Sequence, residues 1–492
     1  MKRTSSNFLA GVAACLLAPL AAGAASPDKP NFIVINVDDL GYADIGPFGS
    51  NLNRTPNLDR MAAEGRKLTC FYAAPVCSPS RSALMTGCYP KRVLPIPSVL
   101  FPAAAVGLNP AERTIAELLR DAGYKTACVG KWHLGDQPEF LPTRQGFDEY
   151  LGIPYSNDMG PAAEGSKSSL GDPLPQRKPK AAKDAASADA EADETGIRGA
   201  QQPPLPLLEN EKVIDRVGPE EQQGIVERYT GAAVKFIRAQ QGAPFFLYLP
   251  HSAVHFPLYP GKAFQQRSHN GLYGDWVEEV DASVGRILDV VRELKLAGRT
   301  LVLFTSDNGG TPRSVNAPLH GFKGSTWEGG MRVPTVVWWP GKIPAKTSTD
   351  EVTGMFDVLP TLVKLAGGTL PADRRLDGAD VWPLLSGAAG AKSPHEVFYY
   401  FRGLKLEAVR SGKWKLHLGK NELYDLEADL AEASSVAAKH ADVVRQLERL
   451  AKKMDDDLGT STIGPGCRPL GRVASPQPLI DFDGKIRAGF SP

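Results

Sequence analysis

Three short stretches of this chain are almost entirely apolar, and each is followed within two residues by polar residues. They are residues 31–37, 244–249 and 300–304. Apolar runs without alternation are typical of parallel strands that are buried on both faces of a sheet. In open α/β sheets, ligands bind beyond the carboxyl ends of such strands. The pattern therefore predicts an α/β fold with polar chemistry at the ends of its strands.

The residues that follow these strands are rich in oxygen ligands. Asp38 and Asp39 follow the first run, and Asp307 and Asn308 follow the third. Acidic turns are the alternative interpretation, because Asp and Asn are common in turns. The four residues include no Cys or His of the zinc type, and oxygen donors of this kind select Ca²⁺ or Mg²⁺ over zinc.

A second feature is the sequence Cys-Ser-Pro-Ser-Arg-Ser-Ala-Leu-Met-Thr-Gly at residues 77–87. Pro79 lacks an N–H and suits a first helical turn, so Cys77 is expected just ahead of a helix N-terminus, where anions are favoured. Arg81 lies four residues further on, on roughly the same face, and its guanidinium can bind oxyanions. A buried structural Cys beside a surface Arg is the alternative interpretation.

This motif, Cys-x-Pro-Ser-Arg-x-x-x-x-Thr-Gly, resembles the modification motif of the type I sulfatases. In that family the Cys is oxidised after translation to formylglycine, an aldehyde that becomes the nucleophile. Residues 130–135, 255–257 and 321–334 are similar to further motifs of the family. A weaker match, Pro-Tyr-Ser at 154–156, is similar to the arylsulfatase A and N-acetylgalactosamine-6-sulfatase branch.

The resemblance implies a role for each matching residue. The catalytic set would be Cys77, Arg81, Lys131, His133, His255 and Lys323. Substrate-binding residues would be Ser156, His255 and Lys323. The metal ligands would be Asp38, Asp39, the modified Cys77, Asp307 and Asn308, around Ca²⁺ or alternatively Mg²⁺. His251 has no matching motif and is expected to be structural.

The resemblance also implies a mechanism. The aldehyde at Cys77 hydrates to a diol, and one hydroxyl, activated by the cation and Asp307, attacks sulfur. His255 gives a proton to the leaving alcohol. The second hydroxyl then loses its proton to His133, and sulfate departs. A sulfated carbohydrate or aryl sulfate is the expected substrate, and a formylglycine-generating enzyme is the expected partner during maturation.

Two other functions stay open at this point. One is a phosphonate or phosphate monoester hydrolase of the same superfamily, and the other is a sulfoglycan-binding pseudoenzyme in which Cys77 remains a thiol. Composition gives no support to a nucleic-acid binder, because 56 basic and 55 acidic residues leave a net charge of +1.

The resemblance extends from Asn31 to about Leu458 and implies an alkaline-phosphatase-like α/β sandwich. We expect a large mixed, mostly parallel sheet flanked by helices over residues 25–385. A smaller C-terminal domain over residues 386–492 is predicted to hold four short antiparallel strands, followed by a helix at 435–458. Residues 161–206, rich in Ala, Asp, Glu, Lys, Pro and Ser, are predicted to form a mobile surface insertion.

The first 24 residues are typical of a secretory signal peptide. Lys2 and Arg3 precede an apolar run at 8–22, and Ala-Gly-Ala at 22–24 offers a cleavage site. We expect an exported protein, periplasmic or secreted, without a transmembrane segment; lipid anchoring at Cys15 is the alternative. Among the remaining cysteines, Cys70, Cys88, Cys128 and Cys467 allow three disulfide pairings or four free thiols.

Overall fold

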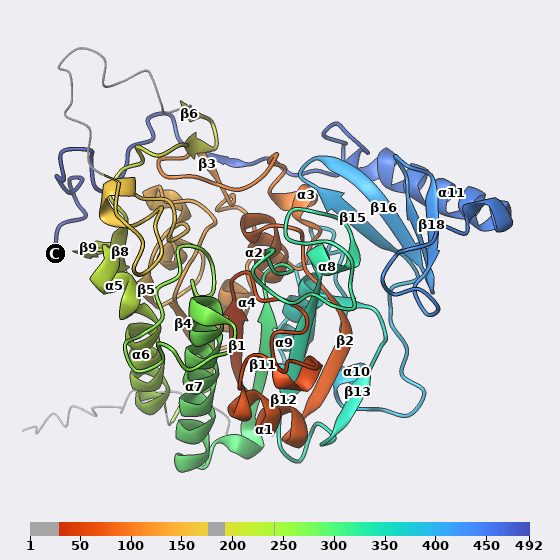
Figure 1. The fold of residues 1–492 in the computed structure, drawn as a ribbon, viewed down its shortest axis with the longest axis horizontal. Helices are drawn as coiled ribbons and strands as arrows, with labels where there is room; N and C mark the ends of the chain where they lie inside the picture. The colour runs from red at the N-terminus through yellow and green to blue at the C-terminus, as the bar shows by residue number, and fades with distance from the viewer. Residues whose placement is uncertain (1–28, 176–191, 241) are drawn as a thin grey trace, which may run out of the picture.

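A mixed β-sheet runs through the centre of the protein, with helices on both faces (Figure 1). The computed structural model describes residues 29–175, 192–240 and 242–492. The expected signal peptide, Cys15 and the middle of the 161–206 segment lie outside the described residues. Within them, the central sheet has eleven strands, and a second sheet of four strands lies towards the C-terminus.

The centre of the large sheet is parallel, as predicted. Strand β1 pairs in parallel with β10 and β11, and β10 continues in parallel to β4 and β5. Antiparallel pairs occur towards both edges, where β12 joins β11 and β8 joins β5. Across the sheet, the order is β13 (Thr347–Thr349), β2 (Arg66–Tyr72), β12 (Arg332–Trp338), β11 (Thr300–Ser306), β1 (Asn31–Val37), β10 (Phe245–Pro250), β4 (Lys125–Val129), β5 (Glu149–Gly152), β8 (Pro206–Glu209) and β9 (Lys212–Arg216), with β14 (Thr353–Gly354) beside β2.

Strand β1 shows why its sequence has no polar alternation. Successive side chains of a strand point to opposite faces of the sheet. Phe32 and Val34 enter one hydrophobic core, and Ile33 and Ile35 enter the other. Because both faces are covered by helices, every position of the strand has to be compatible with burial, and all seven residues are buried.

Helices from distant parts of the chain cover the two faces. One core contains side chains of α1, α6 and α7, and the other contains side chains of α2, α4 and α9. The helices are α1 (Pro56–Glu64), α2 (Cys77–Thr86), α3 (Pro90–Val93), α4 (Ile115–Asp121), α5 (Pro219–Gln223), α6 (Ile225–Ala239), α7 (Gly271–Glu293), α8 (Glu328–Met331), α9 (Val358–Leu365), α10 (Trp382–Leu385) and α11 (Ala441–Leu458). The α/β sandwich expected from the sequence is confirmed.

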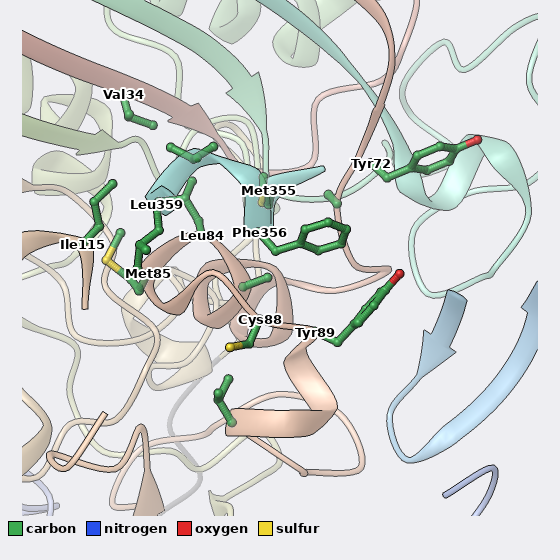
Figure 2. Close-up of a cluster of buried hydrophobic side chains, with 14 of the residues drawn as sticks. Val34, Tyr72, Leu84, Met85, Cys88, Tyr89, Ile115, Met355, Phe356 and Leu359 are labelled. Carbon is green, nitrogen blue, oxygen red and sulfur yellow. The ribbon is translucent and has the colours of Figure 1, made fainter. Parts of the chain in front are cut away.

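Helix α2 carries the Cys77 motif through the interior of the protein. All ten of its residues are buried, and Leu84 and Met85 pack with Leu359 in the cluster shown in Figure 2. The helix begins at Cys77 itself, one step earlier than predicted, and ends at Gly87, whose φ of 70° lies in the left-handed region that favours glycine. A helix packed on all sides fixes the position of its first residue.

Residues 219–239 form two helices, α5 and α6, which meet at Gly224. The predicted C-terminal helix has different bounds in the structure. The helix expected at 435–458 begins only at Ala441. His440 before it has a φ of −133°, outside the helical range, and a short 3₁₀ turn covers Ala437–Lys439.

The four predicted C-terminal strands are all present and form an antiparallel sheet. They are β15 (Phe398–Arg402), β16 (Lys405–Ser411), β17 (Trp414–His417) and β18 (Glu422–Asp425), in that order. After α11, β19 (Gly471–Arg472) pairs with β3 (Val106–Gly107) in a separate two-stranded sheet. The chain then reaches the large sheet, where the Phe490 carbonyl accepts a hydrogen bond from Val213 on β9. Figure 1 accordingly shows the C-terminus beside β8 and β9.

The small sheet is attached to the large one through buried charges. Lys415 on β17 donates to Glu328 at 2.9 Å and forms an ion pair with Glu432 at 2.8 Å. Tyr72 and Tyr400 donate to the same Glu328 carboxylate at 2.6 and 2.9 Å. Because an unpaired buried charge is strongly unfavourable, this cluster fixes how the two sheets meet.

The five cysteines that the structure describes are all free, so no disulfide joins Cys70, Cys88, Cys128 or Cys467. Among the described residues, no helix has the length and apolar character needed to cross a membrane.

Replacing Lys415 with Met should destabilise the protein by about 3 to 5 kcal/mol, because two buried carboxylates lose their cation. The free energy of unfolding from urea titration, followed by tryptophan fluorescence, checks this. Lys413→Met is the matched control. Lys413 also pairs with a carboxylate, Asp425, but is 39% exposed, so its loss should cost at most about 1 kcal/mol. Equal effects of the two variants would contradict the assigned role of the buried cluster.

A buried carboxyl on α7 predicts a pH-dependent stability. Burial raises the pKa of Glu279 from 4.5 to about 7. The folded protein therefore holds this proton more tightly than the unfolded chain, and the stabilisation present below about pH 4.5 is lost as the pH rises through about 7. Glu279→Gln should raise the free energy of unfolding at pH 8 by up to roughly 3 kcal/mol, with no gain at pH 4. The exposed Glu448→Gln variant should show no such pH difference.

Candidate active site

The candidate site lies at the carboxyl ends of the central parallel strands. Strand β1 ends at Val37, directly before Asp38 and Asp39, and β11 ends at Ser306, directly before Asp307 and Asn308. Val37 and Ser306 are partners in the parallel register. The two oxygen-rich pairs, 268 residues or more apart in sequence, are therefore neighbours in space.

The Asp38 carboxylate is the centre of the site. It accepts hydrogen bonds from Arg81 Nη2 at 2.9 Å and Lys131 Nζ at 2.5 Å, both to Oδ2. Its Oδ1 lies 3.4 Å from the sulfur of Cys77. Asp38, Arg81 and Lys131 have no exposed side-chain surface. Residues from three distant motifs thus meet on one carboxylate.

Arg81 binds the protein's own carboxylates in this arrangement. Besides Asp38, its Nη2 and Nε donate to Asp307 Oδ2 at 2.7 and 3.1 Å, and its Nη1 donates to the Lys131 carbonyl at 2.5 Å. This guanidinium therefore holds the two strand ends and the Lys131 segment together. The alternative of a surface Arg is excluded.

Asp39 forms the second half of the site. Its Oδ1 accepts from Lys323 Nζ at 2.7 Å and from Asn308 Nδ2 at 2.8 Å, and His255 Nε2 lies 3.7 Å from its Oδ2. The Asn308 Oδ1 atom is buried and has no hydrogen-bond partner among the described residues. Asp39 itself has a φ of 63°, in the left-handed region, which Asp adopts more readily than most residues with a side chain.

Charges around the site shift the pKa values of its acids in opposite directions. Burial alone would raise the pKa of Asp38, but Lys131, His255 and Arg81 hold it well below its usual range. Burial and then the Asp38 charge raise the pKa of Asp307. Asp38 is therefore the stably ionised acceptor, and a further cation near Asp307 would be favourable.

The Cys77 thiol lies among negative charges. Burial raises its pKa well above the usual range, and Asp307 and Asp38 raise it further. A thiol in this environment stays protonated, and the protonated form is a weak nucleophile. The position therefore suits an unmodified cysteine nucleophile poorly.

Ser156 is buried, and His255 beside it is partly exposed. Lys131 Nζ donates to Ser156 Oγ at 3.0 Å, and Ser156 Oγ lies 3.4 Å from His255 Nδ1. The His255 ring is 12% exposed and Lys323 is 19% exposed, unlike Asp38 and Arg81. The partly exposed His255 and Lys323 mark the entrance of the site. Ser156, from the weakly matching Pro-Tyr-Ser segment, contacts Lys131 and His255.

His133 is buried beside the backbone of Leu100. Its Nε2 lies 2.8 Å from the Leu100 carbonyl, and its Nδ1 is buried without a hydrogen-bond partner in the described part of the chain. Burial, with Lys131 and Arg81, lowers its pKa well below the usual value, so the ring is neutral. The carbonyl can only accept, so Nε2 carries the proton and Nδ1 is free to accept one.

His251 is buried, and its Nε2 lies 3.2 Å from the Ser283 hydroxyl, a contact that agrees with the structural role predicted for it. The sequence did not predict the contact between His133 and the Leu100 carbonyl, because any residue type can supply a backbone acceptor.

The sequence also did not predict the contacts that hold the loop of Lys323 in place. Trp327 packs between His320 and His417, with ring centroids 4.3 and 4.1 Å away, and Thr326 donates to Glu407 at 3.0 Å. His417 and Glu407 belong to the C-terminal sheet, so no local sequence motif could predict their contacts with Trp327 and Thr326.

The donor atoms are close enough to share one cation. One ligand atom from each of Asp38, Asp39, Cys77 and His255 lies within 4.8 Å of the others. The negative charges of three carboxylates are balanced by three cationic side chains. The carboxylates are those of Asp38, Asp39 and Asp307, and the cations are Arg81, Lys131 and Lys323. A divalent cation added to this balanced set would leave the site positive, which suits an anionic ester.

Comparisons with known proteins agree with this geometry. Residues 30–368 match the Sulfatase family, and residues 320–457 match the family described as N-sulphoglucosamine sulphohydrolase, C-terminal. Arylsulfatase A of Homo sapiens is 40% identical over 422 residues, covering 83% of this chain and 78% of that protein. N-acetylgalactosamine-6-sulfatase of Sus scrofa is 37% identical over 415 residues, covering 80% and 72%.

A solved structure of Ps i-CgsB in complex with k-i-k-neocarrahexaose has a TM-score of 0.69 and 29% identity, covering 87% of this chain and 92% of that one. The curated relatives named above are sulfatases, so neither the phosphonate or phosphate ester hydrolase nor the pseudoenzyme is favoured. On the family match, the relatives and the shared fold, this chain belongs to the sulfatase family and is a sulfuric ester hydrolase.

Proposed function

We propose that this sulfatase hydrolyses sulfate esters of carbohydrates with a formylglycine made from Cys77 as its nucleophile. The observation that carries the proposal is the position of Cys77. It is the first residue of a fully buried helix, with its sulfur 3.4 Å from Asp38 Oδ1. Because burial, and then the neighbouring carboxylates, raise the pKa of a thiol here and keep it protonated, an oxidised side chain explains this position better than a thiol does.

Formylglycine, when hydrated, would supply one hydroxyl to attack sulfur and a second whose deprotonation expels sulfate. The residues of the chain would provide the surroundings for this chemistry. Lys131 contacts Asp38, and Lys323 contacts Asp39. The ammonium groups of both lysines can bind the oxygens of an anionic ester. Arg81 holds Asp38 and Asp307 in place, as a positioning residue.

Two histidines would handle the protons. His255 lies at the entrance between Ser156 and Asp39, where an alcohol would leave, and we assign it the proton donor. His133 is neutral, with Nε2–H directed at the Leu100 carbonyl, and its unpartnered Nδ1 is assigned the acceptor of the second hydroxyl's proton. The two rings thus take opposite roles because their environments differ.

A divalent cation, Ca²⁺ or alternatively Mg²⁺, fits the donor set of Asp38, Asp39, Asp307 and Asn308. All four offer oxygen, and the buried Asn308 Oδ1 has no hydrogen-bond partner among the described residues. A bound cation would polarise a sulfate oxygen and favour an oxyanion nucleophile. His255 Nε2 is close to Asp39, but an imidazole is a less typical ligand of these hard cations.

The substrate class is supported by the relatives. One is a sulfatase of a named amino sugar, and one solved relative holds a neocarrahexaose, which is a carbohydrate. Comparing turnover of a panel of sulfated sugars with aryl sulfate, aryl phosphate and aryl phosphonate esters tests this assignment. We also propose that the chain is exported after loss of residues 1–24 and that a formylglycine-generating enzyme modifies it while it is unfolded.

Changing Cys77 should abolish turnover. Cys77→Ala removes the nucleophile, and kcat should fall by about a thousandfold or more. Cys77→Ser should lose turnover too and retain sulfate on the enzyme, because Ser has no second hydroxyl to expel it. Peptide mass spectrometry should show the wild-type Cys77 peptide lighter than the thiol form and reactive towards hydrazides.

The matched control is Cys128→Ala, which changes another fully buried free cysteine outside the site and should leave sulfatase activity and the Cys77 modification in place. Full activity from protein whose Cys77 is entirely an unmodified thiol would contradict the proposal.

Removing the cation should also abolish activity. Chelation is expected to reduce sulfate release to background, and Ca²⁺ should restore it better than Zn²⁺, because the ligands are hard oxygens. Asp307→Asn should weaken Ca²⁺ binding in direct titration of the chelated protein. Stoichiometric zinc without calcium or magnesium in active protein would show that the donor set is assigned wrongly.

A further inference from the structure

We propose that Arg313 and Phe256 form a second anion-binding subsite at the entrance of the active site, on the side where the alcohol leaves. The subsite would take a sulfate or carboxylate group other than the one that is hydrolysed. This inference rests on the proposed function and narrows its substrate class to carbohydrates that carry at least two anionic groups.

Arg313 and Phe256 connect the two loops that carry the entrance side chains Lys323 and His255. Phe256 directly follows His255, and the Arg313 guanidinium carbon lies 5.1 Å from the centre of the Phe256 ring. Arg313 belongs to residues 309–322, the loop that leads from Asn308 to Lys323. An anion held here would therefore lie next to His255 and the departing alcohol.

Arg313 sits on a loop whose backbone is held firmly. The next residues, Ser314 and Val315, are anchored: Val315 N donates to Asp44 Oδ1 at 3.0 Å, and its carbonyl accepts from Ala43 at 2.8 Å. The Ser314 hydroxyl donates to the Thr311 carbonyl at 2.6 Å. Asp44 is itself buried. An anchored backbone lets a side chain select among ligands, because less ordering is needed on binding.

The charge of Arg313 is available, unlike that of the cations inside the site. Lys131 and Lys323 each contact a carboxylate within the site. Arg313 is exposed, and in residues 29–175, 192–240 and 242–492 its side chain has no carboxylate within ion-pair distance. Contact with the Phe256 ring restricts the guanidinium without using its N–H groups, which can form paired hydrogen bonds to a sulfate or carboxylate.

The position excludes the scissile sulfate as the ligand of Arg313. That group would lie between Cys77, Lys131 and Lys323, inside the site. Arg313 contacts Phe256, the residue after His255, and has no ion pair with the carboxylates of the inner site, so we assign it to the carbohydrate that leaves. A second anionic substituent of that carbohydrate is the ligand which this arrangement fits.

The test compares wild-type protein with Arg313→Ala and Arg313→Lys. Substrates are a neutral sugar with one sulfate, a sugar with two sulfates, and a monosulfated disaccharide that contains a uronate. The measured quantity is kcat/KM for each doubly charged substrate divided by kcat/KM for the singly charged one. The Arg445→Ala variant, which removes an exposed arginine on α11 at the outer side of the small sheet, is the control (Figure 1).

We expect Arg313→Ala to reduce this ratio about tenfold, the effect of losing one charge-assisted hydrogen-bonded pair. Arg313→Lys should give a smaller loss, and Arg445→Ala none. A fall confined to the disulfated or to the uronate substrate would identify which anion binds. An unchanged ratio, or an equal fall for all three substrates, would overturn the proposal.

A binding measurement tests the subsite independently of the proposed sulfatase reaction. Calorimetric titration of Cys77→Ala protein, with and without Arg313→Ala, measures affinity for the same sugars without turnover. The doubly charged sugars should lose affinity about tenfold, selectively, when Arg313 is replaced. If the wild-type enzyme released no sulfate from any sugar, the substrate class would be wrong, while the selective loss of affinity would still decide the subsite.

Discussion

The buried Asp38 carboxylate is the contact on which the site depends. It lies at the end of a central strand, and it meets Arg81 from α2, Lys131 from the segment after β4 and the sulfur of Cys77. None of these charges can be buried alone without a large desolvation penalty. Each group is therefore stable in this place only because the others are present, and the arrangement forms as a unit.

A second buried carboxylate, Glu328, has the same function for the loop that carries Lys323. Glu328 accepts from Lys415 of the small sheet at 2.9 Å, and its backbone N–H donates to Glu432 at 2.7 Å. Trp327 packs against His417 on the same sheet. The small sheet therefore affects the candidate active site although it supplies none of the side chains assigned to catalysis, because it positions the loop of Lys323, the lysine that we propose to bind substrate.

The carboxylates of Asp38, Asp39 and Asp307 also explain how a site of high charge stays ordered. Each cation of the inner site has a carboxylate partner, and the protein's own charges cancel before any ligand binds. A divalent cation would then make the site positive for an anionic ester. Arg313, outside this balanced set, keeps a charge that no carboxylate of the described residues neutralises, and this is why we assign it to the substrate rather than to the protein.

The sequence by itself determined the local chemistry of this protein. The apolar runs predicted the central strands, because a strand buried on both faces has apolar residues at every position. The Cys77 motif predicted the helix that α2 forms, and short stretches separated by tight turns predicted the four strands of the small sheet. The tertiary structure decided what these pieces do together. Only the parallel register brings Asp38 beside Asp307, only the packing of α2 directs Arg81 at both, and only the meeting of two sheets supplies Lys415 to Glu328. Such contacts join residues hundreds of positions apart, and a local pattern holds no information about distances that the packing of the whole chain sets.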